Sequence, residues 1–147
     1  INEDTIDVIA SDHAPHTLKE KNNSYLSAPS GGPLVQHALL ALLDLENKQQ
    51  ISLKQIVKKI SHDVADCFKI DKRGYLRAGY FADIVLINRN KKNIVGKENI
   101  LYKCGWSPFE GTEFNSSIIS TFVNGERIFH KGLIKESKLG MRLKFES

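Results

Sequence analysis

The chain has 147 residues, of which 41% are hydrophobic and 26% charged, and its formal net charge is +4. This composition is typical of a globular protein, and the length fits one domain or parts of two. Lysines are scattered among acidic residues without a block of like charge, which argues against a nucleic-acid partner, and no apolar run approaches the roughly 20 residues of a membrane span.

The two cysteines, Cys67 and Cys104, lie far apart in the sequence. They form neither a disulfide framework nor a CxxC metal motif, so we expect a reducing, cytoplasmic location. We expect Cys67 to lie in the core and Cys104 to be a loop thiol. The chain begins at Ile1, and we interpret it as a piece of a longer protein.

The first predicted element is a short buried strand. Residues 5–11 are β-branched and apolar, and they end abruptly in a polar cluster. Pro15 disfavours helix at Ala14, so the cluster is predicted to be a loop that directly follows the strand. Residues 17–31 are polar and rich in Ser, Asn and Gly, which predicts an exposed loop.

Two helices are predicted next. Pro33 suits the first turn of a helix over residues 34–46, which is apolar over much of its surface. Ser52 and Gln55 have the spacing of a capping box. Apolar residues then follow at helical intervals and predict an amphipathic helix that ends near Phe68.

The rest of the chain is predicted to be rich in β-structure. Residues 83–87 and 117–123 have the composition of strands. Asn124 and Gly125 separate the second strand from residues 126–130. Because both residues tolerate positive φ, they are a strong signal for a β-hairpin.

The polar cluster after the first strand has the residues needed for catalysis. In α/β barrels, catalytic groups sit at the carboxyl ends of the strands, and Asp12 is placed there. A carboxylate can bind a divalent metal and accept a proton from metal-bound water. His16 fits either a second metal ligand or a donor to an anionic substrate. The spacing alone also fits an Asx-turn with solvated histidines.

Seven short motifs spread over the chain match a known enzyme family. They are Ala-Ser-Asp-His-Ala-Pro-His at 10–16, Glu-Lys at 20–21, Ala-Pro-Ser-Gly-Gly at 28–32, Arg-Gly-Tyr-Leu-Arg-Ala-Gly at 73–79, Ala-Asp-Ile-Val-Leu at 82–86, Trp-Ser-Pro-Phe-Glu-Gly at 106–111 and Phe-Val-Asn-Gly at 122–125. The first resembles the signature after the last barrel strand of dihydroorotases, which belong to the amidohydrolase superfamily. The motifs at 73–79 and 82–86 are similar to segments found throughout that superfamily.

The resemblance implies an α/β fold, namely the C-terminal part of a (β/α)8 TIM-type metal-dependent hydrolase barrel with part of a small accessory β-domain. Residues 1–70 would supply the last strand, the active-site loop and the closing helices. Residues 71–147 would form the β-rich accessory segment. A complete barrel needs roughly 250 residues. We therefore expect this chain to be part of a longer parent, and to be inactive and a weak metal binder by itself.

The resemblance also assigns roles to four residues. Asp12 matches the aspartate that binds metal and acts as general base and acid, and His16 matches the histidine that binds the substrate carboxylate. Ser30 and Gly31 match a loop pair that contacts substrate, although many relatives have Phe where Ser30 stands. The family implies two Zn²⁺ ions per complete subunit, with the other ligands outside this chain. His13 has no role in that pattern.

The implied activity is that of a dihydroorotase. This enzyme reversibly hydrolyses the cyclic amide of dihydroorotate to N-carbamoyl-aspartate in pyrimidine biosynthesis. We expect a cytoplasmic homo-oligomer that acts on this small molecule and has no nucleic-acid or membrane partner. Two alternatives stay open. One is another cyclic amidohydrolase, such as an allantoinase or dihydropyrimidinase, although these usually lack the His-Ala-Pro-His form. The other is a non-catalytic dihydroorotase-like scaffold subunit.

Residues outside the cluster are predicted to be structural. His37 is interpreted as a packing or interface residue and His62 as a structural residue, and His130 has no evident partner in the sequence. Trp106 is interpreted as the anchor of a long loop. Residues 19–21 are interpreted as part of a solvated loop, with the alternative that this loop borders the substrate entrance.

Overall fold

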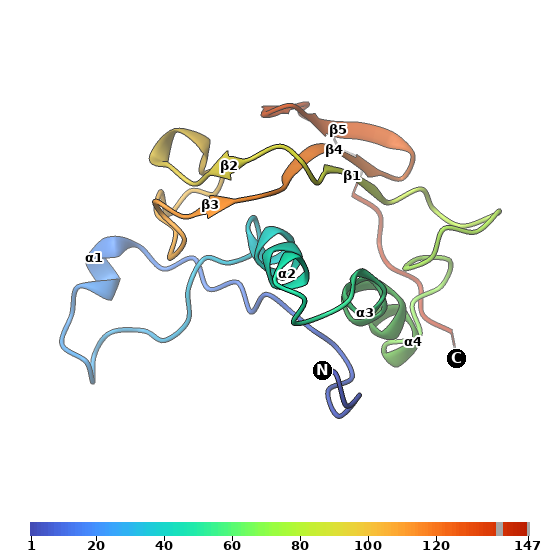
Figure 1. The fold of residues 1–147 in the computed structure, drawn as a ribbon, viewed down its shortest axis with the longest axis horizontal. Helices are drawn as coiled ribbons and strands as arrows, with labels where there is room; N and C mark the ends of the chain where they lie inside the picture. Colours follow the sequence, from blue (N-terminus) through green and yellow to red (C-terminus); the bar gives the residue numbers. More distant parts are fainter. Residues whose placement is uncertain (138–139, 147) are drawn as a thin grey trace.

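The computed structural model describes residues 1–137 and 140–146. Its helices form a central layer, with two β-sheets on one side and the N-terminal segment on the other (Figure 1). None of the helices in the described ranges is long and apolar enough to cross a membrane.

The helical layer contains one isolated helix and one longer run. α2 spans Ala38–Asn47. The run that follows it consists of α3 (Leu53–Val57), the π-helical turn η1 (Lys58–His62) and α4 (Asp63–Cys67), which succeed one another without a break. A short helix, α1 (Leu18–Lys21), lies apart from this layer in the loop near the N-terminus (Figure 1).

The capping box that we predicted for the second helix is confirmed. The Ser52 hydroxyl accepts a hydrogen bond from the Gln55 backbone N–H at 3.2 Å, and the Gln55 side chain accepts one from the Ser52 N–H at 3.0 Å. These bonds satisfy backbone donors that the first helical turn leaves without partners. The run ends at Cys67, one residue before the predicted end, but the π-helical turn within it was not predicted.

The β-structure has six short strands within the described residues. They are β1 (Ile84–Asn88), β2 (Asn93–Ile94), β3 (Glu113–Phe114), β4 (Ser117–Val123), β5 (Glu126–His130) and β6 (Leu133–Ile134), with a 3-10 turn, η2 (Lys97–Asn99), between β2 and β3. One sheet has the order β1-β4-β5-β6, and β2 pairs with β3 in a second. The strands predicted at 83–87, 117–123 and 126–130 are therefore confirmed.

β1 through β4 form a long two-stranded arm. β1 pairs antiparallel with β4, and β2 pairs antiparallel with β3 farther along the same two chain segments. Residues 95–112 connect β2 to β3 at the far end of this arm, where they fold back toward α2 (Figure 1). The arm thus brings residues 95–112 close to the N-terminal loop, although the two segments are far apart in the sequence.

The predicted hairpin between β4 and β5 is confirmed. Asn124 and Gly125 have φ values of 52° and 85°, as a turn with two left-handed residues requires. The Asn124 backbone N–H also donates to the Asp83 carboxylate at 2.8 Å, and Arg73 pairs with both side chains. The hairpin is therefore tied to the segment that precedes β1.

The strand predicted at residues 5–11 is wrong for this structure. These residues form neither helix nor strand. A strand needs a neighbour to complete its hydrogen bonds, and none of the described strands lies beside this segment. The Ile9 N–H instead donates to the carbonyl of Lys59 in η1 at 3.0 Å.

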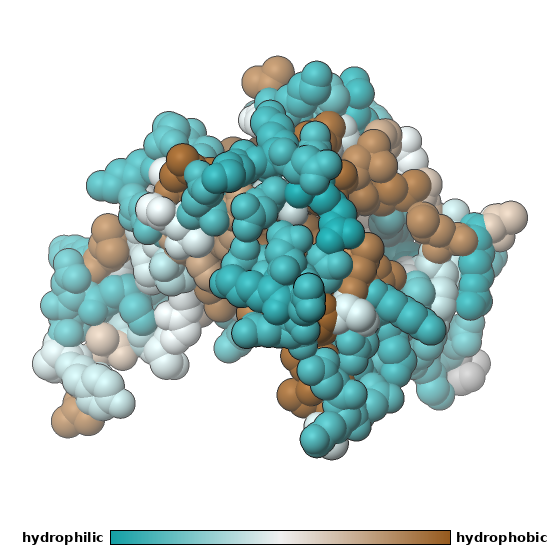
Figure 2. Space-filling model, viewed as in Figure 1, coloured by the Kyte–Doolittle hydropathy of each residue, from teal (hydrophilic) through white to brown (hydrophobic). Residues whose placement is uncertain are grey.

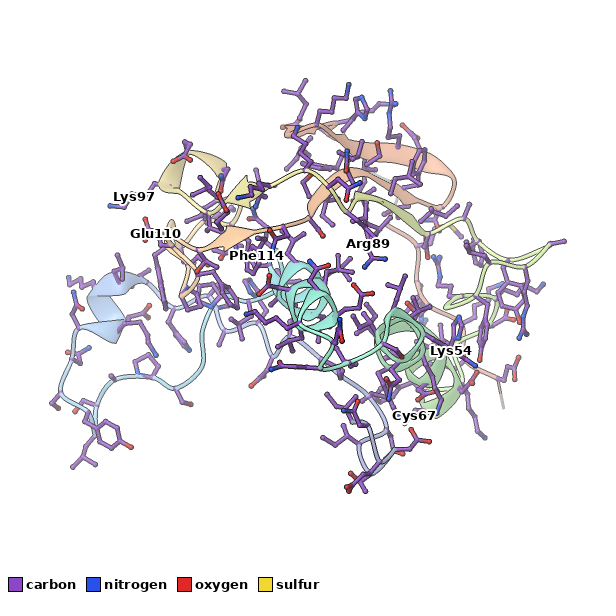
Figure 3. All side chains as sticks on the ribbon, in the orientation of Figure 1. Lys54, Cys67, Arg89, Lys97, Glu110 and Phe114 are labelled. Carbon is purple, nitrogen blue, oxygen red and sulfur yellow. The ribbon has the colours of Figure 1, made fainter. Side chains whose placement is uncertain are left out.

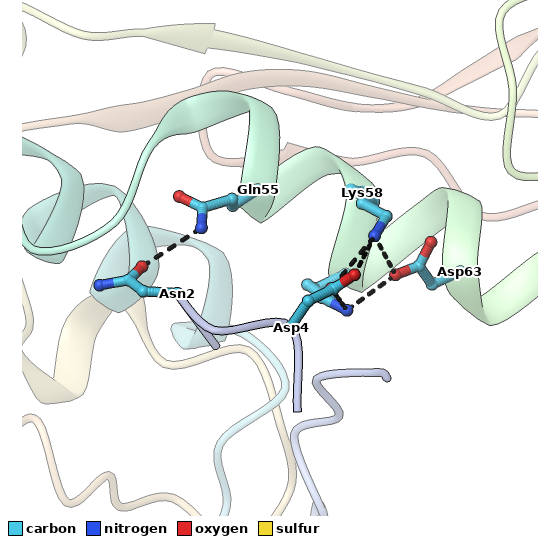
Figure 4. Close-up of polar contacts among 6 residues, drawn as sticks. Asn2, Asp4, Gln55, Lys58 and Asp63 are labelled. Carbon is cyan, nitrogen blue, oxygen red and sulfur yellow. Dashed lines mark hydrogen bonds and ion pairs between the residues drawn. The ribbon is translucent and has the colours of Figure 1, made fainter. Parts of the chain in front are cut away.

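Ion pairs fix the start of the chain against the helical run (Figure 4). The Lys59 ammonium is buried, with the side chain only 3% exposed, between Asp4 at 2.5 Å and Asp63 at 3.0 Å. Asp4 also pairs with Lys58 at 3.1 Å. A buried ammonium needs such partners because burial without them is strongly unfavourable.

The core joins the helices to the arm. It consists of Leu40, Leu43, Ile51, Ile56, Val95 and Phe114. Figure 3 shows Phe114 between the arm and α2. The prediction that Cys67 lies in the core is wrong, because Cys67 is exposed at the end of α4.

Apolar side chains remain at the surface around the sheet, where brown patches interrupt the hydrophilic surface (Figure 2). Leu86 and Ile134 are among them. Between α2 and the four-stranded sheet lies an open groove of about 640 Å³ with a mainly apolar lining.

The Asp4 ion pairs predict a dependence of stability on pH. The hydrogen bond from Lys59 holds the Asp4 pKa below its ordinary value of 3.8, and the same bond raises the Lys59 pKa above 10.5. The stability that the Asp4 carboxylate contributes is fully present above pH 3.8 and is lost as pH falls through the lowered Asp4 pKa. The Lys59 contribution is present below pH 10.5 and is lost as pH rises through the raised pKa.

Asp4→Asn should therefore lower the melting temperature by a few degrees between about pH 4 and 10, and by less outside this window. Thermal unfolding followed by circular dichroism across pH measures this difference. Asp7→Asn, in the same exposed segment, is the matched control and should change little. A constant difference across the whole pH range would contradict the ion-pair assignment.

Gly74 should not tolerate a side chain. Its φ is 79°, and an added Cβ would lie 2.5 Å from the Ala65 Cβ and 2.8 Å from the Ser61 carbonyl oxygen. We expect Gly74→Ala to lower the free energy of unfolding by about 3 kcal/mol in urea titrations. Gly79→Ala is the control: φ is 83° there with open space around it, so the loss should be about 1 kcal/mol. Equal losses of unfolding free energy in the two variants would show that the close approach of the new Cβ to Ala65 and Ser61 has no effect.

Candidate active site

The candidate site is the loop at residues 12–16, which follows the extended N-terminal segment. Asp12 has a φ of 43°, in the left-handed region that aspartate tolerates better than most residues. Asp12 is exposed, and no donor in the described ranges hydrogen-bonds to its carboxylate. The carboxylate is therefore free to bind a cation or accept a proton.

One side of this loop rests on the glycine pair at residues 31 and 32. The Ala14 N–H donates to the Gly32 carbonyl at 3.0 Å, and His13 forms an isolated parallel bridge with Gly32. Gly31 has a φ of 79°, and a Cβ there would lie 2.7 Å from the Ala14 Cβ. The structure thus brings Gly31 directly against the Asp12 loop, with Ser30 exposed beside it.

Lys21 shapes the loop that leads to these glycines. Its ammonium donates to the carbonyls of Pro29 at 2.6 Å and Gly31 at 3.0 Å. The interpretation of residues 19–21 as solvated loop is therefore wrong for Lys21. These two contacts start from a fixed position, because Lys21 is the last residue of the helix α1.

α1 is the element that the sequence prediction missed in the exposed loop at 17–31. The Thr17 hydroxyl and the Glu20 carboxylate form a reciprocal capping box. Hydrogen bonds from the Thr17 hydroxyl and N–H hold the Glu20 pKa below its ordinary value, and the charge of His16 acts in the same direction. The Thr-x-x-Glu spacing was the signal that could have revealed this helix.

The other side of the Asp12 loop contacts the connection at residues 95–112. The His13 ring lies 5.4 Å from the Tyr102 ring, between centroids, and the Trp106 indole N–H donates to the His16 carbonyl at 2.8 Å. The prediction that Trp106 anchors a loop is confirmed. Tyr102 donates in turn to the Pro33 carbonyl at 2.9 Å, so the same connection also reaches the end of the glycine loop.

His37 lies buried behind this contact and is a packing residue, as predicted. It is 1% exposed, and its Nδ1 lies 3.2 Å from the Ser107 hydroxyl. Its ring stacks on Phe114 with a centroid distance of 6.3 Å. Burial lowers the pKa of His37, which keeps the imidazole neutral.

The two remaining histidines lie away from the loop. His62 stacks on Tyr75 at 4.2 Å, which supports its predicted structural role. His130 has a partner that the sequence did not indicate, because its Nδ1 lies 2.8 Å from the Ser120 hydroxyl across the β4–β5 pair.

A complete metal site does not form from the residues in the described ranges. No three His, Cys, Asp or Glu side chains gather there in a way that could hold a metal ion. A zinc site needs three or four protein ligands. Asp12 can supply one, so the residues of this chain do not by themselves fit the zinc pair that we expected.

The loop thus presents an exposed carboxylate and a half-buried histidine on a backbone that is fixed from two sides. The chain belongs to the amidohydrolase family, whose model matches residues 1–128. It is 35% identical to a dihydroorotase from Methanosphaera stadtmanae over 86% of this chain and 30% of that protein. It is 34% identical to a dihydroorotase from Pyrococcus horikoshii over 95% of this chain and 32% of that protein.

Solved structures show the same fold. A D-hydantoinase (dihydropyrimidinase) from Thermus sp. superposes with a TM-score of 0.81 at 19% identity, covering 92% of this chain and 31% of that one. A dihydropyrimidinase from Brevibacillus agri superposes with a TM-score of 0.78 at 25% identity, covering 87% of this chain and 29% of that one. The predicted fold class, part of an amidohydrolase barrel with β-structure, is confirmed. The chain spans about a third of the length of these relatives.

We expect the 147-residue chain by itself to bind zinc weakly. Calorimetric titration should show no binding event tighter than about micromolar, because one carboxylate cannot replace a full ligand set. Asp12→Asn is the matched variant and should remove any weak binding at the loop. Two tight sites on the isolated chain would contradict this expectation.

Proposed function

We propose that this chain supplies the C-terminal part of a dihydroorotase that reversibly hydrolyses dihydroorotate to N-carbamoyl-aspartate in pyrimidine biosynthesis. The observation that carries the proposal is the presence of Asp12 and His16 on one fixed loop, with the Asp12 carboxylate free of hydrogen-bond donors in the described part of the chain. The dihydroorotases among its relatives, 35% and 34% identical, support the same substrate.

Each residue of the loop has a role in this proposal. Asp12 accepts a proton from the attacking water and delivers it to the leaving ring nitrogen, as a general base and acid. His16 binds the carboxylate of the substrate and so fixes its orientation. Ser30 and Gly31 line the site next to the loop. Asp12 would also be one ligand of a zinc pair, whose other ligands would come from outside this chain.

A second cyclic amide is the alternative substrate. The solved structures that this chain resembles are hydantoinases and dihydropyrimidinases, and their substrates would fill the same kind of site. The anionic group of dihydroorotate distinguishes the two possibilities, because it needs a donor such as His16. A non-catalytic scaffold subunit is the third reading, and it predicts no turnover of either substrate.

The rest of the proposal concerns the whole protein. We propose a boundary near residue 70 between the barrel part and the accessory segment. We also propose a cytoplasmic enzyme that forms homo-oligomers and acts on a small molecule. The scattered charges, without a block of one sign, and the absence of a CxxC motif support this setting.

Substitutions in the full-length protein that contains these residues test the roles. Asp12→Asn should lower kcat for dihydroorotate by about 10²- to 10⁴-fold, because it removes the general base. His16→Gln should raise KM by about 10- to 100-fold through loss of a charge-assisted hydrogen bond. Steady-state assays with dihydroorotate measure both effects.

His62→Gln is the control for these variants, because His62 stacks on Tyr75 away from the loop. Its kinetic constants should stay within about twofold of the unmodified protein. Turnover of hydantoin or dihydrouracil without turnover of dihydroorotate would replace the proposed substrate. Absence of turnover with all three would favour the scaffold reading.

A further inference from the structure

We propose that Trp106 is a positioning residue for His16, and thereby a determinant of selectivity for substrates that carry a carboxylate. This inference rests on the proposed function, because it assigns a purpose to the orientation of His16. The geometry that carries it is the indole hydrogen bond to the His16 carbonyl, which joins residues 90 positions apart in the sequence.

The backbone of His16 is held at both of its polar groups. Its N–H donates to the Ala14 carbonyl at 2.9 Å, which closes a tight turn around Pro15. Its carbonyl accepts from Trp106 Nε1 at 2.8 Å. Pro15 fixes its own φ, so little freedom remains in this turn. The direction in which the His16 side chain leaves the backbone is then set by these two bonds.

Trp106 itself is held in place by the residue that follows it. Ser107 is buried, and its hydroxyl lies 3.2 Å from Nδ1 of His37. The same hydroxyl accepts a hydrogen bond from the Phe109 N–H at 3.2 Å. Because His37 is buried at the start of α2, this contact connects the segment that carries Trp106 to the protein core.

Because Trp106 lies in the connection between β2 and β3, the position of His16 depends on how the arm is packed. A substrate carboxylate requires a donor within a few tenths of an ångström of the correct place, and small displacements weaken a charge-assisted bond. Asp12 lies on the far side of the Ala14–Gly32 contact, which does not involve Trp106. Loss of the indole bond should therefore affect substrate binding more than proton transfer.

The first test examines the contact without relying on activity. Trp106 is the only tryptophan, so a ¹⁵N-labelled chain gives a single indole resonance. We expect its N–H to exchange with solvent at least tenfold more slowly than a free indole. In Trp106→Phe, the amide resonances of residues 16 and 17 should shift. An indole exchanging at the free rate would overturn the inference.

Tyr75→Phe is the matched control for this test. It removes a hydrogen bond of 2.6 Å to Asp66, at an aromatic residue remote from the loop. The amide resonances of residues 16 and 17 should not move in this variant. If they move as much as in Trp106→Phe, the effect is a general loss of structure and the positioning role fails.

The second test measures selectivity in the full-length protein. With dihydroorotate, Trp106→Phe should raise KM about three- to tenfold while kcat stays within about twofold. The inhibition constant of dihydrouracil, which has the ring amide but no carboxylate, should change by no more than about twofold when it competes with dihydroorotate. An equal loss of kcat and of dihydroorotate binding, or an equal weakening of dihydrouracil, would overturn the inference. If the unmodified protein does not turn over dihydroorotate, the proposed function fails, and the indole exchange test still decides whether Trp106 holds His16.

Discussion

The packing of the arm against α2 is the constraint on which the rest of the structure depends. Val95 and Phe114, at the far end of the arm, share a buried cluster with Leu40 and Leu43 of α2. Burial of such side chains contributes about 1.5–3 kcal/mol each, which is enough to fix the arm in one orientation. Residues 95–112 begin and end beside this cluster, so its packing holds them next to the Asp12 loop.

The candidate site combines exposed side chains with a restrained backbone. Asp12 and His16 lie at the surface or half-buried, whereas main-chain groups of the same loop bond to Gly32 and Trp106. Fixing the backbone in this way reduces the entropy lost when a substrate is bound and oriented. The same loop is linked to the start of the chain through the segment that Asp4 and Ile9 attach to η1.

Much of the local structure could be predicted, because its causes are local. The capping box at Ser52 and the Asn124 turn depend on residues within three positions of each other. Because these few neighbouring residues set the backbone conformation by themselves, the sequence pattern is sufficient to predict it. The α1 helix was equally local and was missed only because the polar composition of the surrounding residues outweighed its capping box. The strand predicted at 5–11 failed for the opposite reason, since a strand depends on a partner that local sequence does not specify.

The sequence by itself determined the family motifs, the helix caps, the β-hairpin and the two residues of the candidate site, Asp12 and His16. Only the tertiary structure decided which contacts hold the loop of Asp12 and His16, and the segments next to it, in place. The contacts of Trp106 with His16, of Lys21 with the Gly31 carbonyl and of Lys59 with Asp4 join residues 10 to 90 positions apart. Such contacts leave no periodic pattern or spacing in the sequence, because they follow from how the arm and the helices pack around a shared core.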